Sequence, residues 1–211
     1  MINFSAQSTA VFMTPPVSLE ERYGPLASSG SSSPCLASAI LSAIARKAGY
    51  PAFIIDAAAE GLSLNETLER LESIRPDFIG FTTTTLTTLP AERVAREVRM
   101  RWPNTVIAIG GPHATAIPEE TLRRCPDFDL AAVHEGDRTI LDILQAIDGA
   151  GRDLSNVAGI VCRDSGGQLV RTAARSPFQD LDSLDFPAWD LLPDFPEKYN
   201  PGFFKVGQIP S

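Results

Sequence analysis

The sequence contains few of the residues that metal sites and disulfide frameworks require. It has only two histidines, His113 and His134, which excludes a site built from several imidazole ligands. Its three cysteines, Cys35, Cys125 and Cys162, are separated by dozens of residues. This spacing fits neither a disulfide framework nor a C-x-x-C metal site, so we expect three reduced structural thiols.

Positive charge is also scarce. The formal net charge is -8, and the 18 Lys and Arg residues are scattered along the chain. No basic stripe is available to follow a phosphate backbone, so we expect no nucleic-acid partner. Long apolar runs are absent as well, because Pro, Gly, Ser or Thr interrupt each one, and the N-terminus lacks a secretion signal. We therefore expect a soluble, cytoplasmic protein without a membrane span.

What the chain does contain is a regular alternation of short apolar runs and amphipathic stretches. The alternation predicts successive βα units on a parallel sheet whose two faces are both buried. The expected strands are residues 9–14, 52–56, 78–82, 105–109 and 130–133, and the expected helices are residues 34–48, 64–74, 89–101, 118–124 and 137–147. Pro34 and Pro118 suit first-turn positions and Gly49 suits a helix end. The pattern predicts an α/β fold with a flavodoxin-like, Rossmann-like doubly wound sheet of five parallel strands in the order 2-1-3-4-5.

The pattern changes after residue 150. Two extended runs, residues 157–163 and 168–172, flank Asp164, Ser165, Gly166 and Gly167, which is a hairpin signal. We expect this hairpin to form an antiparallel appendage. Beyond residue 175 the chain is rich in proline and acidic residues with little periodicity, which indicates a linker or docking arm.

A ligand is expected at the carboxyl edge of the sheet, where strands 1 and 3 diverge. Four loops meet there, and they are rich in hydroxyl groups and glycine. Small residues let a bulky ligand approach the backbone, and hydroxyls offer donors and acceptors without charge. The loops comprise residues 15–33, 82–88, 110–115 and 134–137.

Three phosphate-binding or phosphate-accepting sites do not fit these loops. A dinucleotide site needs G-x-G-x-x-G after strand 1, where only Gly24 and Gly30 occur, and no G-x-x-x-x-G-K-[ST] is present. A phosphoacceptor would need an acidic residue at the end of strand 3, where Thr82 stands. A flavodoxin-like redox or nucleotide-binding domain that holds flavin mononucleotide stays open as an alternative.

Taken in order, the loops resemble the cobalamin-binding domain at the front of many radical S-adenosylmethionine enzymes. That group includes cobalamin-dependent methylases and the anaerobic magnesium-protoporphyrin ester cyclase. The matching features are Pro15 and Pro16, Pro34 with Leu36, Gly49 and Tyr50, Asp56, Arg75 to Asp77, Gly80 to Thr82, Gly110 to His113, and Glu135 with Gly136.

The resemblance implies a division of the chain into three parts. Residues 1–150 are expected to bind cobalamin, residues 151–175 to form the hairpin, and residues 176–211 to lead as a docking arm to a radical S-adenosylmethionine barrel that is absent from this chain. In the family, a C-x-x-x-C-x-x-C triplet holds a [4Fe-4S] cluster, and this triplet does not occur here. The resemblance therefore implies that the [4Fe-4S] cluster and S-adenosylmethionine bind to the barrel of the parent protein.

The resemblance also implies which residues contact the cofactor, and it assigns no catalytic or metal-ligating residue to this chain. Neither histidine lies in the D-x-H-x-x-G pattern that places an imidazole on cobalt, which implies a base-off cofactor without a protein ligand and makes a free-standing corrinoid carrier the lesser alternative. The expected cofactor-binding residues are Tyr23, Ser31, Ser32, Ser33, Pro34, Asp56, Thr82, Thr83, Thr84, Thr85, Gly110, Gly111, His113, Glu135 and Gly136.

Overall fold

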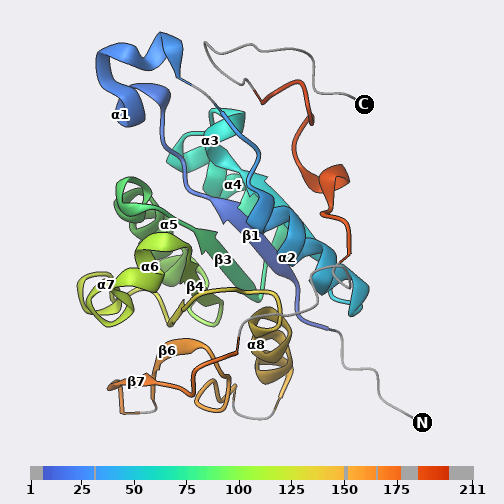
Figure 1. The fold of residues 1–211 in the computed structure, drawn as a ribbon, viewed down its shortest axis with the longest axis vertical. Helices are drawn as coiled ribbons and strands as arrows, with labels where there is room; N and C mark the ends of the chain where they lie inside the picture. Colours follow the sequence, from blue (N-terminus) through green and yellow to red (C-terminus); the bar gives the residue numbers. More distant parts are fainter. Residues whose placement is uncertain (1–6, 31, 150–151, 165, 177–184, 200–211) are drawn as a thin grey trace.

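A single twisted sheet organises the chain (Figure 1). The structure is a computed structural model, and it describes residues 7–30, 32–149, 152–164, 166–176 and 185–199. Ser31 and the proline-rich residues 177–184 and 200–211 therefore lie outside the described residues.

The sheet confirms the predicted doubly wound order and extends it. Its order is β2-β1-β3-β4-β5-β6-β7, and the first five of these strands run parallel. The strands are β1 (Ala10–Thr14), β2 (Ala52–Asp56), β3 (Phe78–Thr82), β4 (Val106–Gly110), β5 (Leu130–Ala132), β6 (Ile160–Arg163) and β7 (Leu169–Arg171).

The predicted hairpin forms, but it continues the sheet instead of standing apart from it. Strand β6 pairs antiparallel with β5, and β7 pairs antiparallel with β6, so the sheet has seven strands rather than five. The Asp164 carboxylate closes the turn by accepting hydrogen bonds from the backbone N–H groups of Gly166 at 2.9 Å and Gln168 at 2.8 Å. Gly167, at φ 78°, supplies the left-handed position that the turn needs.

Helices cover both faces of the sheet, because side chains along each strand alternate between two cores. Val11, Ile79 and Ile107 pack against α4 (Leu64–Ile74), α5 (Thr88–Arg101) and α7 (Pro118–Arg124). Phe12, Phe78 and Ala108 face α2 (Leu36–Lys47) and α8 (Thr139–Asp148) instead. The parallel strands are therefore buried on both sides, as the apolar runs predicted.

The loop between β1 and α2 is more structured than expected. It contains α1 (Leu19–Tyr23) and the 3-10 helix η1 (Gly24–Ser29). Ser18 and Glu21 form a capping box at the start of α1. The S-x-x-E spacing of Ser18 and Glu21 is therefore the local signal for this helix.

Two helix starts also differ from the sequence prediction. Helix α2 begins at Leu36 after the N-cap Cys35, so the first-turn position predicted for Pro34 is wrong, because extended backbone at Cys35 separates Pro34 from the helix. Helix α8 begins at Thr139, two residues later than predicted. Short helices not predicted are α3 (Ala57–Glu60), η2 (Thr85–Thr87) and α6 (Pro112–Ala116).

Part of the proline-rich arm packs on the outer side of α2 (Figure 1). This segment, residues 185–199, contains the 3-10 helix η4 (Trp189–Leu191). Leu192 and Tyr199 are buried in a small cluster with Ala39 of α2 and Ile54 of β2. The described part of the arm therefore belongs to the packed molecule.

Candidate functional site

A pocket of about 500 Å³ lies between α2, α8 and the sheet, at the carboxyl end of β3 and β4. Its volume falls within the range of small-molecule and cofactor sites. The strands end here and both helices begin here, so this is the edge at which the sequence predicted a ligand.

The pocket floor is made by strand positions that carry small side chains. Along β3, Phe78, Gly80 and Thr82 point to the pocket side because alternate residues share a face. A Cβ atom added to Gly80 would lie 3.0 Å from the Phe78 ring and 3.4 Å from the Phe12 ring. Ala108 of β4 is the neighbour of Gly80 in the sheet. Together these two positions leave a hollow in an otherwise packed face.

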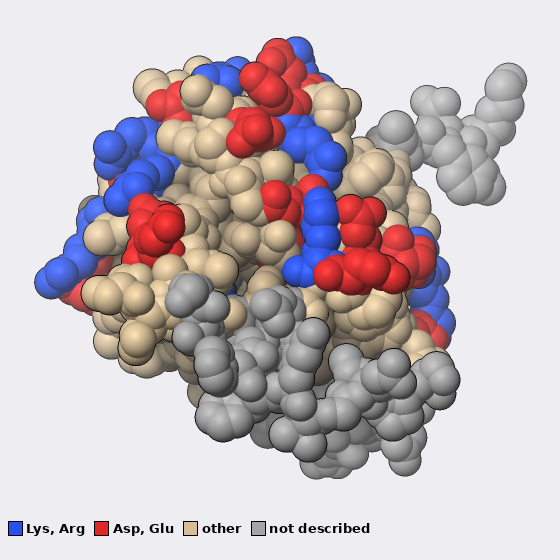
Figure 2. Space-filling model, turned by 90° about the horizontal axis from the view of Figure 1, so that it is seen from above, with Lys and Arg blue, Asp and Glu red and all other residues tan. Residues whose placement is uncertain are grey.

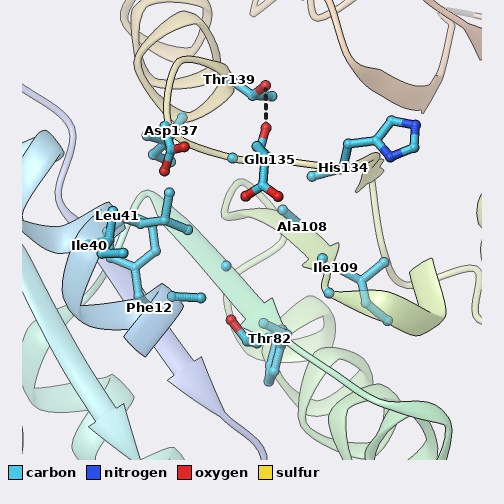
Figure 3. Close-up of a pocket in the computed structure, with 18 of the residues that line it drawn as sticks. Phe12, Ile40, Leu41, Thr82, Ala108, Ile109, His134, Glu135, Asp137 and Thr139 are labelled. Carbon is cyan, nitrogen blue, oxygen red and sulfur yellow. Dashed lines mark hydrogen bonds between the residues drawn. The ribbon is translucent and has the colours of Figure 1, made fainter. Parts of the chain in front are cut away.

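Two carboxylates lie where the loop after β5 enters α8. Figure 3 shows the Glu135 carboxylate pointing toward Ala108 across the pocket, and Asp137 beside Leu41. The Glu135 backbone carbonyl accepts a hydrogen bond from the Thr139 hydroxyl at 3.4 Å. Among the described residues neither carboxylate has a hydrogen-bond or ion-pair partner. Burial, together with the nearby charge of Glu135, raises the pKa of Asp137.

Five of the sequence-predicted residues line this pocket. They come from three different strand ends, and they are Thr82, Gly110, Gly111, Glu135 and Gly136. The Thr82 hydroxyl has no partner among the described residues, so it is available to a ligand. A Cβ atom on Gly136 would lie 3.1 Å from Leu41 Cδ2, which shows how closely the loop approaches α2.

The other predicted threonines hold the loops together and do not line the pocket. The Thr83 hydroxyl donates to the Gly110 carbonyl at 3.1 Å and is buried. The Thr84 carbonyl and Thr85 Oγ1 are both engaged, the latter with His113 Nδ1 at 3.1 Å. Thr83 and Thr85 therefore join the β3 loop to the β4 loop beside the pocket, whereas Thr84 is hydrogen-bonded within its own loop.

The remaining predicted residues lie farther from the pocket lining. Asp56 is buried at the end of β2, where it accepts hydrogen bonds from the Thr14 hydroxyl at 2.6 Å, the Ala59 backbone N–H at 3.2 Å and the Tyr199 hydroxyl at 3.2 Å. Burial raises the pKa of Tyr199, so its hydroxyl remains a donor.

The predicted loop before α2 also lies outside the pocket lining. Tyr23 is partly exposed and packs against Gly30, while Ser32, Ser33 and Pro34 precede Cys35, the N-cap of α2. Ser31 lies outside the described residues. The described residues of this loop lie between β1 and α2 in the chain.

Sequence reasoning missed the inner wall of the pocket. This wall consists of apolar residues that any α/β core contains, namely Phe12, Ile40, Leu41, Phe78, Ala108, Ile140 and Ile143. Gly80, in the middle of a strand of large side chains, was the available signal, because a strand-interior glycine often marks a close approach. Asp137 and His134 also line the pocket, although Figure 3 shows the His134 ring pointing away from its centre.

The surface and the thiols bear on other kinds of site. Figure 2 shows basic and acidic side chains interspersed on the face seen from above. The described residues contain no group of three or more His, Cys, Asp and Glu residues suited to a metal ion.

Burial raises the pKa of Cys125 and of Cys162, which keeps both as thiols. Within the part of the chain that the structure describes, no helix is both long and apolar enough to cross a membrane.

The comparison with known families identifies the kind of domain that carries this pocket. A sequence profile of the B12 binding domain matches residues 24–144, which is more than half of the chain and includes α2, the four parallel strands after it and most of α8. The chain belongs to the B12-binding domain family. It is therefore a cobalamin-binding domain, and the hollow at the carboxyl edge is its candidate cofactor site.

Curated relatives of this B12-binding domain are much longer than it is. An uncharacterized methyltransferase of Pyrococcus horikoshii is 31% identical over 164 residues, which is 78% of this chain and 35% of the relative. An anaerobic magnesium-protoporphyrin IX monomethyl ester cyclase of Rubrivivax gelatinosus is 32% identical over 161 residues, covering 73% of this chain and 28% of the relative. The chain thus spans about a third of these curated relatives or less.

A solved structure shows the same fold. The cobalamin-dependent S-adenosylmethionine radical enzyme OxsB, with aqua-cobalamin and S-adenosylmethionine bound, matches with a TM-score of 0.70 and 20% identity. The match covers 88% of this chain and 25% of that chain. It therefore extends beyond the B12-binding profile to most of the described residues.

The residues of the pocket fit a corrinoid tail. Gly80 and Ala108 leave space that larger side chains would fill, and the surrounding wall is apolar. The hydroxyl and carboxylate side chains of the lining come from the strand ends and the start of α8, and they are Thr82, Thr115, Glu135, Asp137 and Thr139. A ligand with a flat apolar end and a hydroxyl-bearing sugar matches this division, and the nucleotide tail of cobalamin has that form.

Proposed function

We propose that this domain holds cobalamin in a base-off form, with the nucleotide tail in the pocket and no histidine of the chain on cobalt. The observation that supports this proposal is the glycine-floored hollow between α2, α8 and the sheet. His113 is engaged with Thr85, and the His134 ring is directed away from the pocket centre. Neither arrangement presents an imidazole above the pocket.

The proposal gives each part of the site a role. Thr82 and Glu135 meet the polar groups of the tail, and Gly110, Gly111 and Gly136 let the ligand approach the backbone. The corrin ring would lie over the carboxyl edge, against the loops that carry Tyr23, Ser32, Ser33, Pro34, Thr84, Thr85 and His113. Bound cobalamin supplies methyl-transfer or electron-transfer chemistry, whereas the protein supplies position and polarity.

Cobalamin binding tests the proposal directly. Purified protein mixed anaerobically with hydroxocobalamin should bind one equivalent and show a base-off absorbance spectrum. Gly80→Ala should weaken binding by about tenfold, because its new methyl group occupies the pocket floor. Gly149→Ala is the matched control, since its φ is -75° and its new Cβ would make only contacts at 3.4 Å or more.

Two outcomes would contradict this function. One is failure of the wild-type protein to bind cobalamin under anaerobic reconstitution. The other is a yellow protein with flavin fluorescence, which would favour flavin mononucleotide in the same crevice.

We further propose that the domain is the cobalamin-binding part of a longer radical S-adenosylmethionine enzyme, either a methylase or a cyclase. The lengths and names of the relatives support this proposal. The [4Fe-4S] cluster and S-adenosylmethionine would then bind to the rest of that protein. Reading the gene beyond Ser211 tests it, because a C-x-x-x-C-x-x-C triplet should follow. A stop codon directly after Ser211 would contradict it.

A cytoplasmic location belongs to the same proposal. The free thiols of Cys125 and Cys162 suit a reducing compartment. Cell fractionation should place the protein with cytoplasmic markers, and its recovery in a membrane or secreted fraction would contradict this location.

A further inference from the structure

The pocket has a polarity gradient along two of its walls, strand β3 and the side of α8. On β3, Phe78 lies at the deep end, Gly80 in the middle and Thr82 at the mouth, a span of about 13 Å for four strand steps. On the α8 side, Ile143 lies deep, whereas Thr139 and Glu135 lie at the mouth. Helix α2 lines the pocket with apolar residues only, and its Leu41 lies beside Asp137 and Gly136 of the mouth loop. Figure 3 shows Thr82 at the end of its strand and the Glu135 carboxylate pointing into the pocket.

The deep end, defined here by Phe78 and Ile143, offers a ligand no hydrogen-bonding side chain. Its backbone is also occupied, because β3 is paired with β1 on one side and with β4 on the other. Helical hydrogen bonds use the peptide groups within α2 and α8. A polar group buried there would lose its bonds to water without replacement.

This gradient bears on which corrinoid fits. Corrinoids differ in the lower base at the end of the nucleotide tail. Dimethylbenzimidazole presents two methyl groups on its outer edge, whereas adenine presents an amino group and further ring nitrogens. The sugar that links either base to the corrin carries hydroxyl groups, which suit Thr82 and the Glu135 carboxylate at the mouth.

We propose that the deep end selects corrinoids by their lower base and favours dimethylbenzimidazole over adenine. This inference rests on the proposed placement of the tail in the pocket. The adenine amino group would be left without a partner between Phe78 and Ile143, and an unsatisfied buried donor weakens binding. Selection of this kind needs no contact with the corrin ring.

The experiment compares three ligands on the 211-residue chain: methylcobalamin, its adenine-containing analogue and cobinamide, which has no base. Methyl forms are used because the upper methyl group weakens the bond between cobalt and the lower base in the free cofactor. We expect methylcobalamin to bind at least about tenfold more tightly than the adenine analogue. We also expect it to bind more tightly than cobinamide.

A matched pair of variants ties the preference to the deep end. Ile143→Thr adds a hydroxyl to the pocket wall and should reduce the affinity ratio by about threefold or more. Ile147→Thr makes the same change one helical turn later, at a residue that is equally buried but does not line the pocket. Ile147→Thr should keep the affinity ratio of the wild-type protein. The free energy of displacing each base from cobalt is the same for every variant, so it cancels when the ratios are compared.

The outcomes separate this inference from the proposed function. In one outcome, methylcobalamin and its adenine analogue bind equally, and both bind more tightly than cobinamide. This result would support the tail in the pocket and overturn only the base selection. Equal binding of all three ligands would overturn the tail placement and the selection with it. The selection by the deep end would also be overturned if Ile143→Thr and Ile147→Thr changed the ratio of the two affinities equally. If a variant fails to fold, the ratio measured on the wild-type protein decides between the outcomes.

Discussion

Gly111 holds the turn between β4 and α6 in a conformation that a side chain opposes. Its φ is 96°, and an added Cβ atom would lie 2.4 Å from the Thr83 carbonyl oxygen. Thr83 is fixed in turn, because its backbone N–H and its hydroxyl both donate to the Gly110 carbonyl, at 2.9 and 3.1 Å. One glycine therefore lets the loops after β3 and β4 meet at the pocket mouth.

Gly111→Ala should lower the free energy of unfolding by about 2–4 kcal/mol, because it combines backbone strain with a clash. Gly110→Ala is the adjacent control, since its Cβ atom would meet its nearest neighbours at 3.7 and 3.8 Å. That variant should change stability by less than about 1 kcal/mol. Urea unfolding measures both, and equal losses would contradict the role given to Gly111.

Asp137 makes the free energy of unfolding depend on pH. Its raised pKa means that the folded protein binds a proton there more readily than the unfolded chain does, so ionisation of Asp137 costs stability. The cost appears as pH rises above the usual aspartate value of 3.8 and is complete above the raised pKa. Its causes are partial burial and the Glu135 charge, while Arg138 and Arg175 lie on the outer side of the same loop.

Asp137→Asn should therefore stabilise the protein at neutral pH and lose this advantage in acid. Asp153→Asn should behave in the opposite way, because hydrogen bonds from Ser155 lower the pKa of Asp153. Urea unfolding at neutral and acidic pH measures both differences. A gain from Asp137→Asn that persists unchanged in acid would exclude ionisation as its cause.

At the scale of elements, residues 185–199 show which forces hold the arm. Arg46 of α2 forms an ion pair with Asp190 at 2.6 Å, but the two side chains are 48% and 63% exposed. Trp189 stacks on Phe195 with ring centres 5.1 Å apart, and Leu192 is buried between α2 and β2. Exposed ion pairs contribute little, so apolar burial holds the arm in place.

Leu192→Ala should cost about 2–4 kcal/mol of unfolding free energy, because it leaves a cavity in the cluster with Ala39 and Ile54. Arg46→Ala should cost less than about 1 kcal/mol. Chemical unfolding compares the two, and limited proteolysis reports whether the arm detaches. A larger loss from Arg46→Ala would show that charge holds the arm.

Most elements were predictable because each has its own local signal. The apolar runs of β1 to β4 and the capping residues Ser63 and Glu66 of α4 lie within the segments that form them. The pairing of β6 with β5 was not predictable, since it depends on the free edge that β5 presents after folding. The burial of Leu192 depends likewise on a groove that α2 and β2 create together.

The site was predictable at its rim and not in its interior. Glycine and hydroxyl-rich loops after parallel strands pointed to the edge at which the pocket lies, and five of the predicted cofactor-binding residues line it. The interior arises from the absence of atoms at Gly80 and Ala108, and a sequence pattern of apolar residues does not distinguish a hollow from a filled core. The assignment of each of these predicted residues as a cofactor contact stays a prediction, for those that line the pocket as well as for those that do not.

At the scale of the whole molecule, one sheet links the pocket to both cores. The pocket shares three of its lining residues with the core under α2 and α8, namely Phe12, Phe78 and Ala108. A ligand that fills the pocket binds only the folded chain, so binding and folding are coupled by mass action.

Hydroxocobalamin at about 100 times its dissociation constant should therefore raise the free energy of unfolding by about 2.7 kcal/mol. Thermal unfolding with increasing ligand measures this rise as a higher midpoint. Gly80→Ala, at the same ligand concentrations, should show a smaller rise than Gly149→Ala. A midpoint that does not respond to ligand would mean that the folded chain does not bind it.

Helix α2 has two occupied sides. Ile40 and Leu41 line the pocket, whereas Ala39 and Arg46 contact the arm. Since both contacts depend on the position of one rigid rod, a shift of that rod alters them together. If cofactor binding stabilises one position of α2, it also stabilises the contacts of the arm with that position. By the same coupling free energy, detachment of the arm would lower the affinity for the cofactor.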